Sequence, residues 1–332
     1  MFNINGKNSI AITTRARAFF NLNNINGELY EGLTNNFDVN ENFEFQNNNL
    51  SGTMHVWGEL GFTYGRILME RDRNFLKGGL TLKYLQGSGG LFAESPSMSG
   101  NFDAVSKNLT TTGTASYGTT PGFDNQDVDF SNLSSGIGAD IGLTYEYRPE
   151  FSRDTLSKKL NKYKFKLGVS VTDLGSISYD ESSFNTYDLN NNVDTEIFQD
   201  SDTETILNEN YQGTEEIIVA KINLPTALHL LVDYQIRRRL YLSLQSSLSL
   251  VADDKEFANR IINTFTVSPR LETRWLSVYL PLSLRQYDGL AMGAGLRFGP
   301  LMVGSGSAIT NLISDSSKTT DVYLGLKIPL YQ

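Results

Sequence analysis

The two histidines are the side chains with the widest chemical range, because an imidazole can act as an acid, a base or a metal ligand near neutral pH. His55 and His229 lie in separate segments, each between two apolar residues. A catalytic or metal site needs further converging groups, but the chain has no cysteine and no G-x-S-x-G nucleophile elbow. We therefore predict no catalytic residues, no cofactor and no metal site, and we interpret both histidines as hydrogen-bonded interior side chains.

Charged side chains form the larger candidate set, because they fall on the polar face of alternating segments, where a packed core would exclude them. Both signs are present, which favours paired networks that brace an interior or anchor a plug. An electrostatic funnel would need one sign. Together with the histidines, the predicted inward-facing residues are Arg15, Arg17, Glu59, Asp140, Glu146, Lys164, Lys166, Asp233, Arg270, Glu272, Arg274, Arg285 and Arg297.

An acidic segment is the third feature that could take part in binding or catalysis. Residues 175–216 hold eleven Asp and Glu residues and no Lys or Arg. Clustered oxygen ligands suit hard cations such as calcium. The EF-hand spacing fails, because Val193 stands where the tight-turn glycine belongs and Gln199 where the bidentate glutamate belongs. A solvated acidic outer loop is the favoured interpretation, and weak divalent-ion binding is the alternative.

Strict alternation of side chains is the signal that positions these residues. Within 137–148 the odd positions carry apolar residues and tyrosines, whereas the even positions carry glycine, threonine or charges. Comparable runs cover 163–172, 240–250, 276–285 and 322–331. Successive side chains of a strand point to opposite faces, and about ten residues suffice for a tilted strand to cross a membrane.

A water-soluble sandwich or barrel also alternates, so the alternation alone does not decide between the two environments. The runs exceed the usual soluble strand of about 5–6 residues. Aromatic residues gather at run ends, as in interfacial girdles. The polar face also carries charges, which a water-filled or plugged lumen keeps solvated or paired. These details favour a membrane barrel over a soluble all-β protein.

Twelve strands are predicted by the pattern. They cover 8–22, 52–66, 74–88, 135–149, 162–174, 223–237, 239–252, 262–275, 276–287, 289–298, 300–307 and 320–331. The connections alternate between mostly short turns and a second side with longer loops, as in bacterial outer-membrane barrels. We predict one domain over 1–332, with long outer or plug-forming loops at 23–51, 89–134 and 175–222, a shorter outer connection at 253–261 and a short helix within 25–35.

The bulk properties exclude two classes of protein. No run of about 18 apolar residues exists, so a transmembrane helix is excluded. The net charge of −9 argues against nucleic acid as the main partner. The first residues lack the apolar core of a signal peptide, and we expect that the chain is shortened at its start.

Five short stretches resemble a known group of proteins: 78–90, 166–179, 222–236, 293–307 and 322–331. They are similar to a Bacteroidota outer-membrane barrel family of unknown function and, more distantly, to FadL-like and PorV-like barrels. The resemblance implies further barrel strands before this segment, which would raise twelve strands to fourteen. That count is an analogy at the level of the fold.

The predicted function follows from this architecture. The first hypothesis is a FadL-like transport or ligand-binding barrel with an occluded lumen in the Gram-negative outer membrane. It would contact outer-membrane lipid and lipopolysaccharide and take a small hydrophobic ligand. The alternatives are a non-transporting barrel that scaffolds a larger envelope or secretion complex through a protein partner, and a soluble all-β protein.

Overall fold

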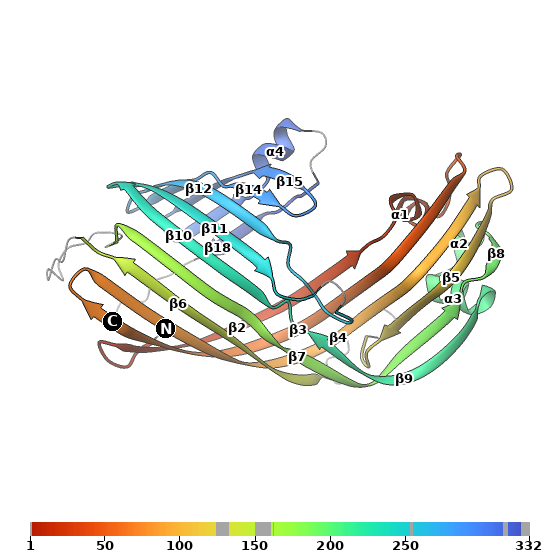
Figure 1. Cartoon of the computed structure of the whole chain (residues 1–332), viewed down its shortest axis with the longest axis horizontal. Coiled ribbons are helices and arrows are strands. Elements are labelled where there is room, and N and C mark those ends of the chain that lie inside the picture. The colour runs from red at the N-terminus through yellow and green to blue at the C-terminus, as the bar shows by residue number, and fades with distance from the viewer. Residues whose placement is uncertain are drawn as a thin grey trace.

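The computed structural model describes residues 2–123, 133–149, 161, 163–252, 255–314 and 318–326. Eighteen strands form one large sheet in which the paired strands are antiparallel. The sheet curves strongly, so that β10 to β12 and the C-terminal strands lie over the floor formed by β2, β6 and β7 (Figure 1). The predicted all-β, antiparallel, barrel-like fold is confirmed.

Eight strands, paired in the order β2–β3–β4–β6–β7–β10–β11–β12, make the main wall. They are β2 (Asn8–Asn23), β3 (Phe43–Arg71), β4 (Asn74–Asp103), β6 (Ser134–Tyr147), β7 (Phe165–Asp188), β10 (Ala227–Arg237), β11 (Leu240–Ser249) and β12 (Thr264–Glu272). The short β1 (Phe2–Asn3) pairs with β2.

Shorter strands continue the wall at its C-terminal side. They are β13 (Leu276–Tyr279), β14 (Leu282–Arg285), β15 (Gly289–Met292), β16 (Ala294–Phe298), β17 (Leu301–Ser305) and β18 (Tyr323–Leu326), with α4 (Ala308–Ile313) before β18. Two predicted spans are each broken in two, β13 from β14 at residues 280–281 and β15 from β16 at Gly293. Pro281 cannot donate to the ladder because it lacks an N–H, and its carbonyl accepts from the Gly293 N–H at 2.9 Å. Within the described residues no pairing joins β18 to β2, and 327–332 lie outside them.

Three wall strands run on into an extension, here called the wing, which comprises residues 24–51, 91–119 and 179–223 (Figure 1, right). The wing adds β5 (Asn108–Thr119), β8 (Asn191–Asp194), β9 (Gln212–Asn223), α1 (Gly27–Thr34), α2 (Ile197–Asp200) and α3 (Thr203–Asn210). Helix α1 begins where the Asn26 side chain accepts hydrogen bonds from the N–H groups of Glu28 and Leu29. The short helix predicted within 25–35 is confirmed.

Two β-bulges mark the boundary between wall and wing. The first lies on β4 opposite Trp57, where Gly89 adopts a φ of 147°. The second lies on β7, where Asp173 has a φ of 58° and Gly175 a φ of 134°. Each bulge inserts a residue into its strand and shifts which residues face inward. Glycine is required at Gly175, because an added Cβ would collide with the Ile137 carbonyl.

Two apolar clusters form the core. The mouth cluster, at the boundary, consists of Trp57, Leu85, Phe92, Ile177, Tyr179, Ala220, Ile222 and Leu224. The wing cluster consists of Leu29, Phe37, Phe45, Phe102 and Leu109. The mouth cluster lies on the side of the sheet that carries Arg17 and Glu59, because Arg17 stacks on Trp57 with 5.0 Å between the guanidinium and the ring. Phe45 of the wing cluster is buried and has the parity of Trp57 and Glu59 on β3, so the wing cluster lies on the same side. This side is called the inner face below.

The outer face of the wall is apolar. On β3, Leu60, Phe62 and Tyr64 are exposed, and they alternate with the inward residues Glu59, Gly61 and Thr63. The same pattern holds on β4, β6, β7 and β10 with Leu80, Leu82, Tyr84, Ile137, Ile141, Leu143, Leu167, Val169, Leu230 and Tyr234. In the wing the outward side of β3 carries Glu44, Gln46 and Asn48 instead. Among the described residues no helix is long and apolar enough to cross a membrane.

The predicted strand spans agree with the structure better than the predicted loops do. Every predicted span contains at least one strand, but two spans split and β1, β5, β8 and β9 are additional, which raises twelve to eighteen. The prediction of long loops at 23–51, 89–134 and 175–222 is wrong. The described parts of these segments are largely strands and helices of the wing. They pair because each carries aromatic residues that pack in the wing cluster or the mouth cluster. Residues 124–132 of the second segment lie outside the described residues.

Candidate functional site

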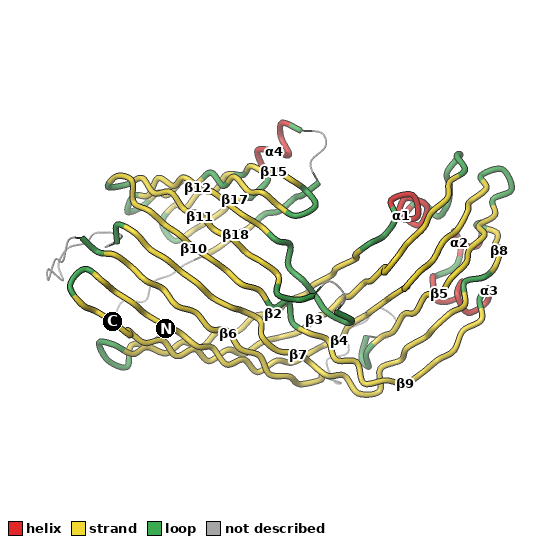
Figure 2. The backbone as a smooth tube through the Cα atoms, in the orientation of Figure 1, coloured by secondary structure: helices red, strands yellow, loops and turns green. Residues whose placement is uncertain are grey.

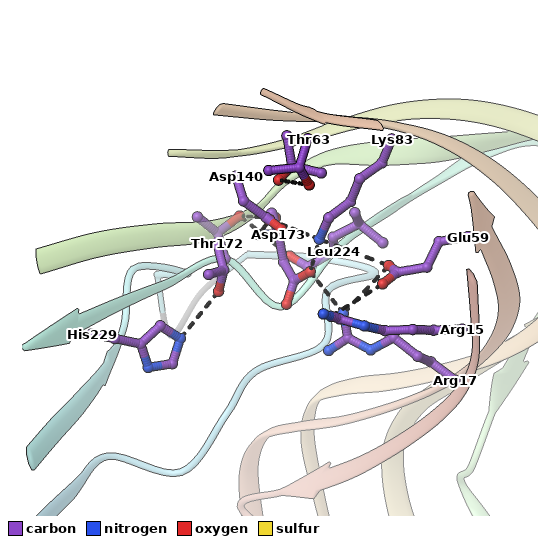
Figure 3. Close-up of polar contacts among 12 residues, drawn as sticks. Arg15, Arg17, Glu59, Thr63, Lys83, Asp140, Thr172, Asp173, Leu224 and His229 are labelled. Atoms are coloured by element: carbon purple, nitrogen blue, oxygen red, sulfur yellow. Dashed lines mark hydrogen bonds and ion pairs between the residues drawn. The ribbon is translucent and has the colours of Figure 1, made fainter. Parts of the chain in front are cut away.

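An ion-pair network on the inner face is the most concentrated group of charges in the wall (Figure 3). Its centre is Lys83, whose side chain is 3% exposed and whose Nζ lies 2.7 Å from Asp140, 2.8 Å from Asp173 and 3.8 Å from Glu59. Arg17 lies 2.7 Å from Asp173 and 3.7 Å from Glu59. The network therefore links β2, β3, β4, β6 and β7.

The β7 bulge positions the acidic partner of this network. The left-handed backbone at Asp173 turns its carboxylate towards Lys83 and Arg17, while its N–H donates to Asp140 at 2.8 Å. The hydroxyl of Thr226 donates to its carbonyl at 2.7 Å. Aspartate tolerates this backbone conformation better than most residues. The local sequence thus places a carboxylate where a regular strand would not present one.

Charges in this network balance. Three cations, Arg15, Arg17 and Lys83, face three anions, Glu59, Asp140 and Asp173. Equal numbers of both signs neutralise one another. The buried Glu59 Oε2 has no hydrogen-bond partner among the described residues and faces Arg17 and Lys83 only at 3.7 and 3.8 Å. Removal of one member would leave an uncompensated charge, which is strongly destabilising. The arrangement therefore braces five adjacent strands.

A second network lies further along the inner face, on β10 and β12. Arg270 lies 2.9 Å from Asp233 and 3.1 Å from Glu272. Asp233 also accepts hydrogen bonds from Tyr163 at 2.7 Å and Ser243 at 3.1 Å. On the neighbouring strands Glu146 pairs with Arg148 at 2.6 Å and Lys77 at 3.7 Å, and Lys166 lies over the Tyr163 ring.

The remaining predicted charges are dispersed. Arg285 pairs with Asp321 at 3.0 Å, and Arg297 donates to Ser277 at 2.7 Å. Lys164 does not join the inner networks, because its ammonium lies 4.7 Å from the ring of Tyr234, a residue of the exposed apolar set. Arg274 is exposed in the turn beside Trp275. Both lie at strand ends, where the alternation no longer fixes the direction of the side chain.

The two histidines lie in different surroundings and do not meet. His55 is fully buried against Trp57, with Nε2 2.8 Å from the Tyr179 hydroxyl. His229 lies between Thr172, 3.1 Å from Nε2, and Ser247, 2.9 Å from Nδ1. Both make hydrogen bonds to neighbouring side chains. Among the described residues no group of three or more His, Asp or Glu residues could hold a metal ion.

Residues 255–263, here called the strap, cross the inner face beside the mouth cluster. Phe257 packs on Phe92 with a ring separation of 4.3 Å, and its carbonyl accepts from the Asn223 N–H at 3.1 Å. Arg260 exchanges two hydrogen bonds with Asn21 on β2, at 2.9 and 3.2 Å. Figure 2 shows this loop descending from β11 and β12 towards β3 and β4. The strap therefore connects opposite sides of the wall across the interior.

The strap covers most of the predicted outer connection 253–261, of which residues 253–254 lie outside the described residues. The described part turns inward because Phe257 completes an aromatic group with Phe92 and Phe184, which buries apolar surface. Within the described part of the chain, the docked strap leaves a buried polar group without hydrogen bonds. The side-chain amide of Asn259 is completely buried, and neither its oxygen nor its nitrogen has a hydrogen-bond partner among the described residues.

Two adjoining hollows lie on the inner face next to the first ion-pair network. Their volumes are about 370 and 310 Å³. Both are lined by Gly142, Thr144 and Ser170. The first extends to His229 and Ser247, and the second to Thr63, Thr81 and Asp140.

Five charged residues of these networks were missed by the sequence interpretation: Lys77, Lys83, Arg148, Asp173 and Asp321. Lys77 and Lys83 share the parity of Gly79 and Thr81, so the alternation within 74–88 contained the signal. Asp173 has the opposite parity to Ser170 and Thr172, and only the bulge brings it to the inner face. A glycine within a strand pattern, as at Gly175, is a local signal of a bulge, but it does not say which carboxylate the bulge turns inward.

Comparison with known proteins gives one family. A family of unknown function, DUF5723, matches residues 1–306. The chain belongs to this family. No curated protein and no solved structure matches the chain.

Proposed function

We propose that the protein is a non-enzymatic β-barrel of the Gram-negative outer membrane, whose lumen the strap closes and which binds or admits a small solute. The observation that carries this proposal is the exposed apolar outer face of the wall. Isolated exposed apolar residues are normal in soluble proteins, but a continuous apolar surface marks an interaction with lipid or protein. Here it coincides with a charged, hydroxyl-rich inner face, the reverse of a soluble barrel.

The height of the apolar band supports the proposed membrane location. On β3 it runs from Met54 to Tyr64, and the next residue of the same parity is Arg66. Eleven residues rise roughly 35 Å along a strand, which is roughly 25 Å across a membrane at a tilt of about 45°. Outer-membrane barrels carry a band of about this height. Lipid acyl chains on the band and lipopolysaccharide around the wall are the partners that this geometry favours.

The membrane part of the proposal is tested with single cysteines, since the chain has none. Phe62→Cys lies on the outer face of the wall, and Gln46→Cys lies on the outer face of the wing of the same strand. Each is labelled with a fluorophore in proteoliposomes and exposed to a lipid-bound quencher and a water-soluble quencher. The proposal expects lipid quenching at 62 and aqueous quenching at 46. Aqueous quenching at both positions would reject the membrane barrel.

The strap supports the transport part. It occludes the mouth between β2, β4 and β9, and its buried amide remains without partners, so its release restores hydrogen bonds to water. Liposome swelling compares the wild type with a variant in which a nine-residue Gly/Ser linker replaces 255–263. We expect swelling in small solutes to rise in the linker variant and to stay unchanged when the exposed wing turn 104–107 is replaced. Equal, absent swelling in all three would reject a solute path.

A second function is favoured by the wing. It projects beyond the apolar band, contains its own cluster and carries most of the acidic segment. These features suit a scaffold that docks a protein partner in an envelope complex. Stoichiometric co-purification of a partner from native membranes, lost when the wing turns are substituted while solute permeability is unchanged, would favour the scaffold over the transporter.

A further inference from the structure

We propose that the two adjoining hollows are one binding site for an uncharged, polyhydroxylated solute of about one or two sugar rings. The inference rests on the proposed barrel function and names the class of its solute. It departs from the hydrophobic ligand that the FadL-like resemblance implies. The evidence is the volume, the lining and the charge balance of the hollows.

The volume fits a small molecule. The hollows measure about 370 and 310 Å³ and share three lining residues, so a ligand can extend from one to the other. Small-molecule sites usually have volumes of about 300–1,000 Å³. A single water would need far less space.

Groups that both donate and accept hydrogen bonds line both hollows beside apolar surface. Hydroxyls of Thr63, Thr81, Thr144, Ser170 and Ser247 border the hollows, joined by the Gln245 amide. Thr63 and Thr81 lie 2.8 Å apart, so either hydroxyl can turn to a ligand and keep one bond. A hydroxyl offers one donor and two acceptor sites, which matches the hydroxyls of a polyol.

The flanking charges are already paired. Asp140 contacts Lys83 at 2.7 Å, and Lys77 lies 3.7 Å from Glu146. A charged solute would have to leave water without gaining an unpaired counter-charge, which is costly. A neutral solute leaves both pairs intact. The aliphatic side chain of Leu231 and the backbone at Gly142 and Gly168 offer contacts for the C–H face of a sugar ring.

Figure 3 shows how the site relates to the first ion-pair network. Thr63, Asp140 and Thr172 lie on the side of the network away from Glu59, and His229 is held by Thr172. His229 also bonds Ser247, so its ring is fixed at the border of the first hollow. The network and the strap thus lie towards the mouth, and the hollows lie behind them in the wall.

The test uses the full chain in nanodiscs and isothermal calorimetry with maltose as the probe. Glucuronate, glucosamine and laurate serve as anionic, cationic and hydrophobic comparators. Gly79→Leu fills the second hollow, because an added Cβ there meets only the Tyr64 carbonyl oxygen at 3.7 Å. Gly6→Leu makes the same change where nothing lies within 4 Å.

We expect maltose to bind more tightly than the three comparators, and the Kd to rise about tenfold or more in Gly79→Leu but not in Gly6→Leu. Tighter binding of a charged or hydrophobic probe, no binding of maltose, or equal Kd values in both variants would overturn the inference. The quenching and swelling experiments are read separately. Lipid quenching and swelling without maltose binding would reject the solute class and leave the barrel function standing.

Discussion

The wall and the wing are built from the same strands but place apolar surface on opposite sides. On β3 the wall exposes Leu60 and Phe62 outward and turns Glu59 inward. Further along the same strand the wing turns Phe45 inward and exposes Glu44 and Gln46. Odd-numbered residues of β3 point inward in both regions. Among these residues the wall therefore has a polar residue at the odd position and apolar residues at even positions, and the wing has the reverse.

This reversal supports the surroundings that we propose for each region. A wing with polar outside and buried aromatics obeys the rule for a protein in water. A wall with the opposite arrangement pairs its inward charges and exposes its apolar side chains, which is the arrangement expected of the membrane barrel that we propose. The bulges at Gly89 and Asp173 lie where one arrangement gives way to the other.

The largest effect is expected from the centre of the wall network. Lys83→Ala removes the cation that contacts three carboxylates and leaves them crowded in a buried site. We expect a loss of about 3–5 kcal/mol in the free energy of unfolding, measured by urea titration of the barrel in detergent micelles. Lys77→Ala, whose side chain is 48% exposed at 3.7 Å from Glu146, should cost below about 1 kcal/mol. Equal losses would show that the network does not brace the wall.

The wing cluster should respond locally. Phe102→Ala removes a fully buried ring that packs on Phe37 and Phe43. We expect about 3 kcal/mol of lost wing stability, seen as faster hydrogen exchange in 98–112 with unchanged exchange in the wall. Thr110→Ala, on the exposed side of β5, is the matched control. Faster exchange across the wall would contradict the separation of the two regions.

The strap contacts both regions. Its buried Asn259 amide predicts the direction in which a substitution changes the stability of docking. Asn259→Leu removes two unpartnered polar atoms and should stabilise docking by about 1 kcal/mol. We expect slower hydrogen exchange of 255–263 and lower swelling rates. Asn263→Leu should act in the opposite direction, because Asn263 accepts from the Ser249 N–H at 2.7 Å. The same direction of change in both variants would refute this account of the docking.

The smallest effect concerns pH. Burial, followed by the nearby carboxylate of Glu256 in the strap, raises the pKa of Glu94 above its ordinary value of 4.5. Undocking removes both causes, so the docked strap binds the proton more tightly. The free-energy penalty that ionised Glu94 places on docking is full above its raised pKa. This penalty disappears as the pH falls below the ordinary pKa. Fluorescence of a probe at Lys255→Cys should report tighter docking on acidification, and Glu94→Gln should abolish this dependence.

Much of the fold could be predicted from the sequence because strand alternation is a local property. Every predicted span contains a strand, and the inward parity of Arg17, Glu59 and Asp233 agrees with their inner-face ion pairs. The wing could not be predicted, because its strands look like polar loops until the aromatic residues of distant segments pack together. Phe45 and Leu109, for example, meet only in the folded sheet.

The sequence by itself determined the all-β class, the two faces of each wall strand and the mixture of charges on one of them, since these follow from residues two apart. Only the tertiary structure decided which charges pair, that Asp173 joins Lys83 through a bulge, and that the loop with Phe257 turns inward. Those features depend on contacts between segments far apart in the chain. A local pattern can signal a bulge but not the partners that meet there, because the free energy that selects those partners is gained only when the surfaces meet.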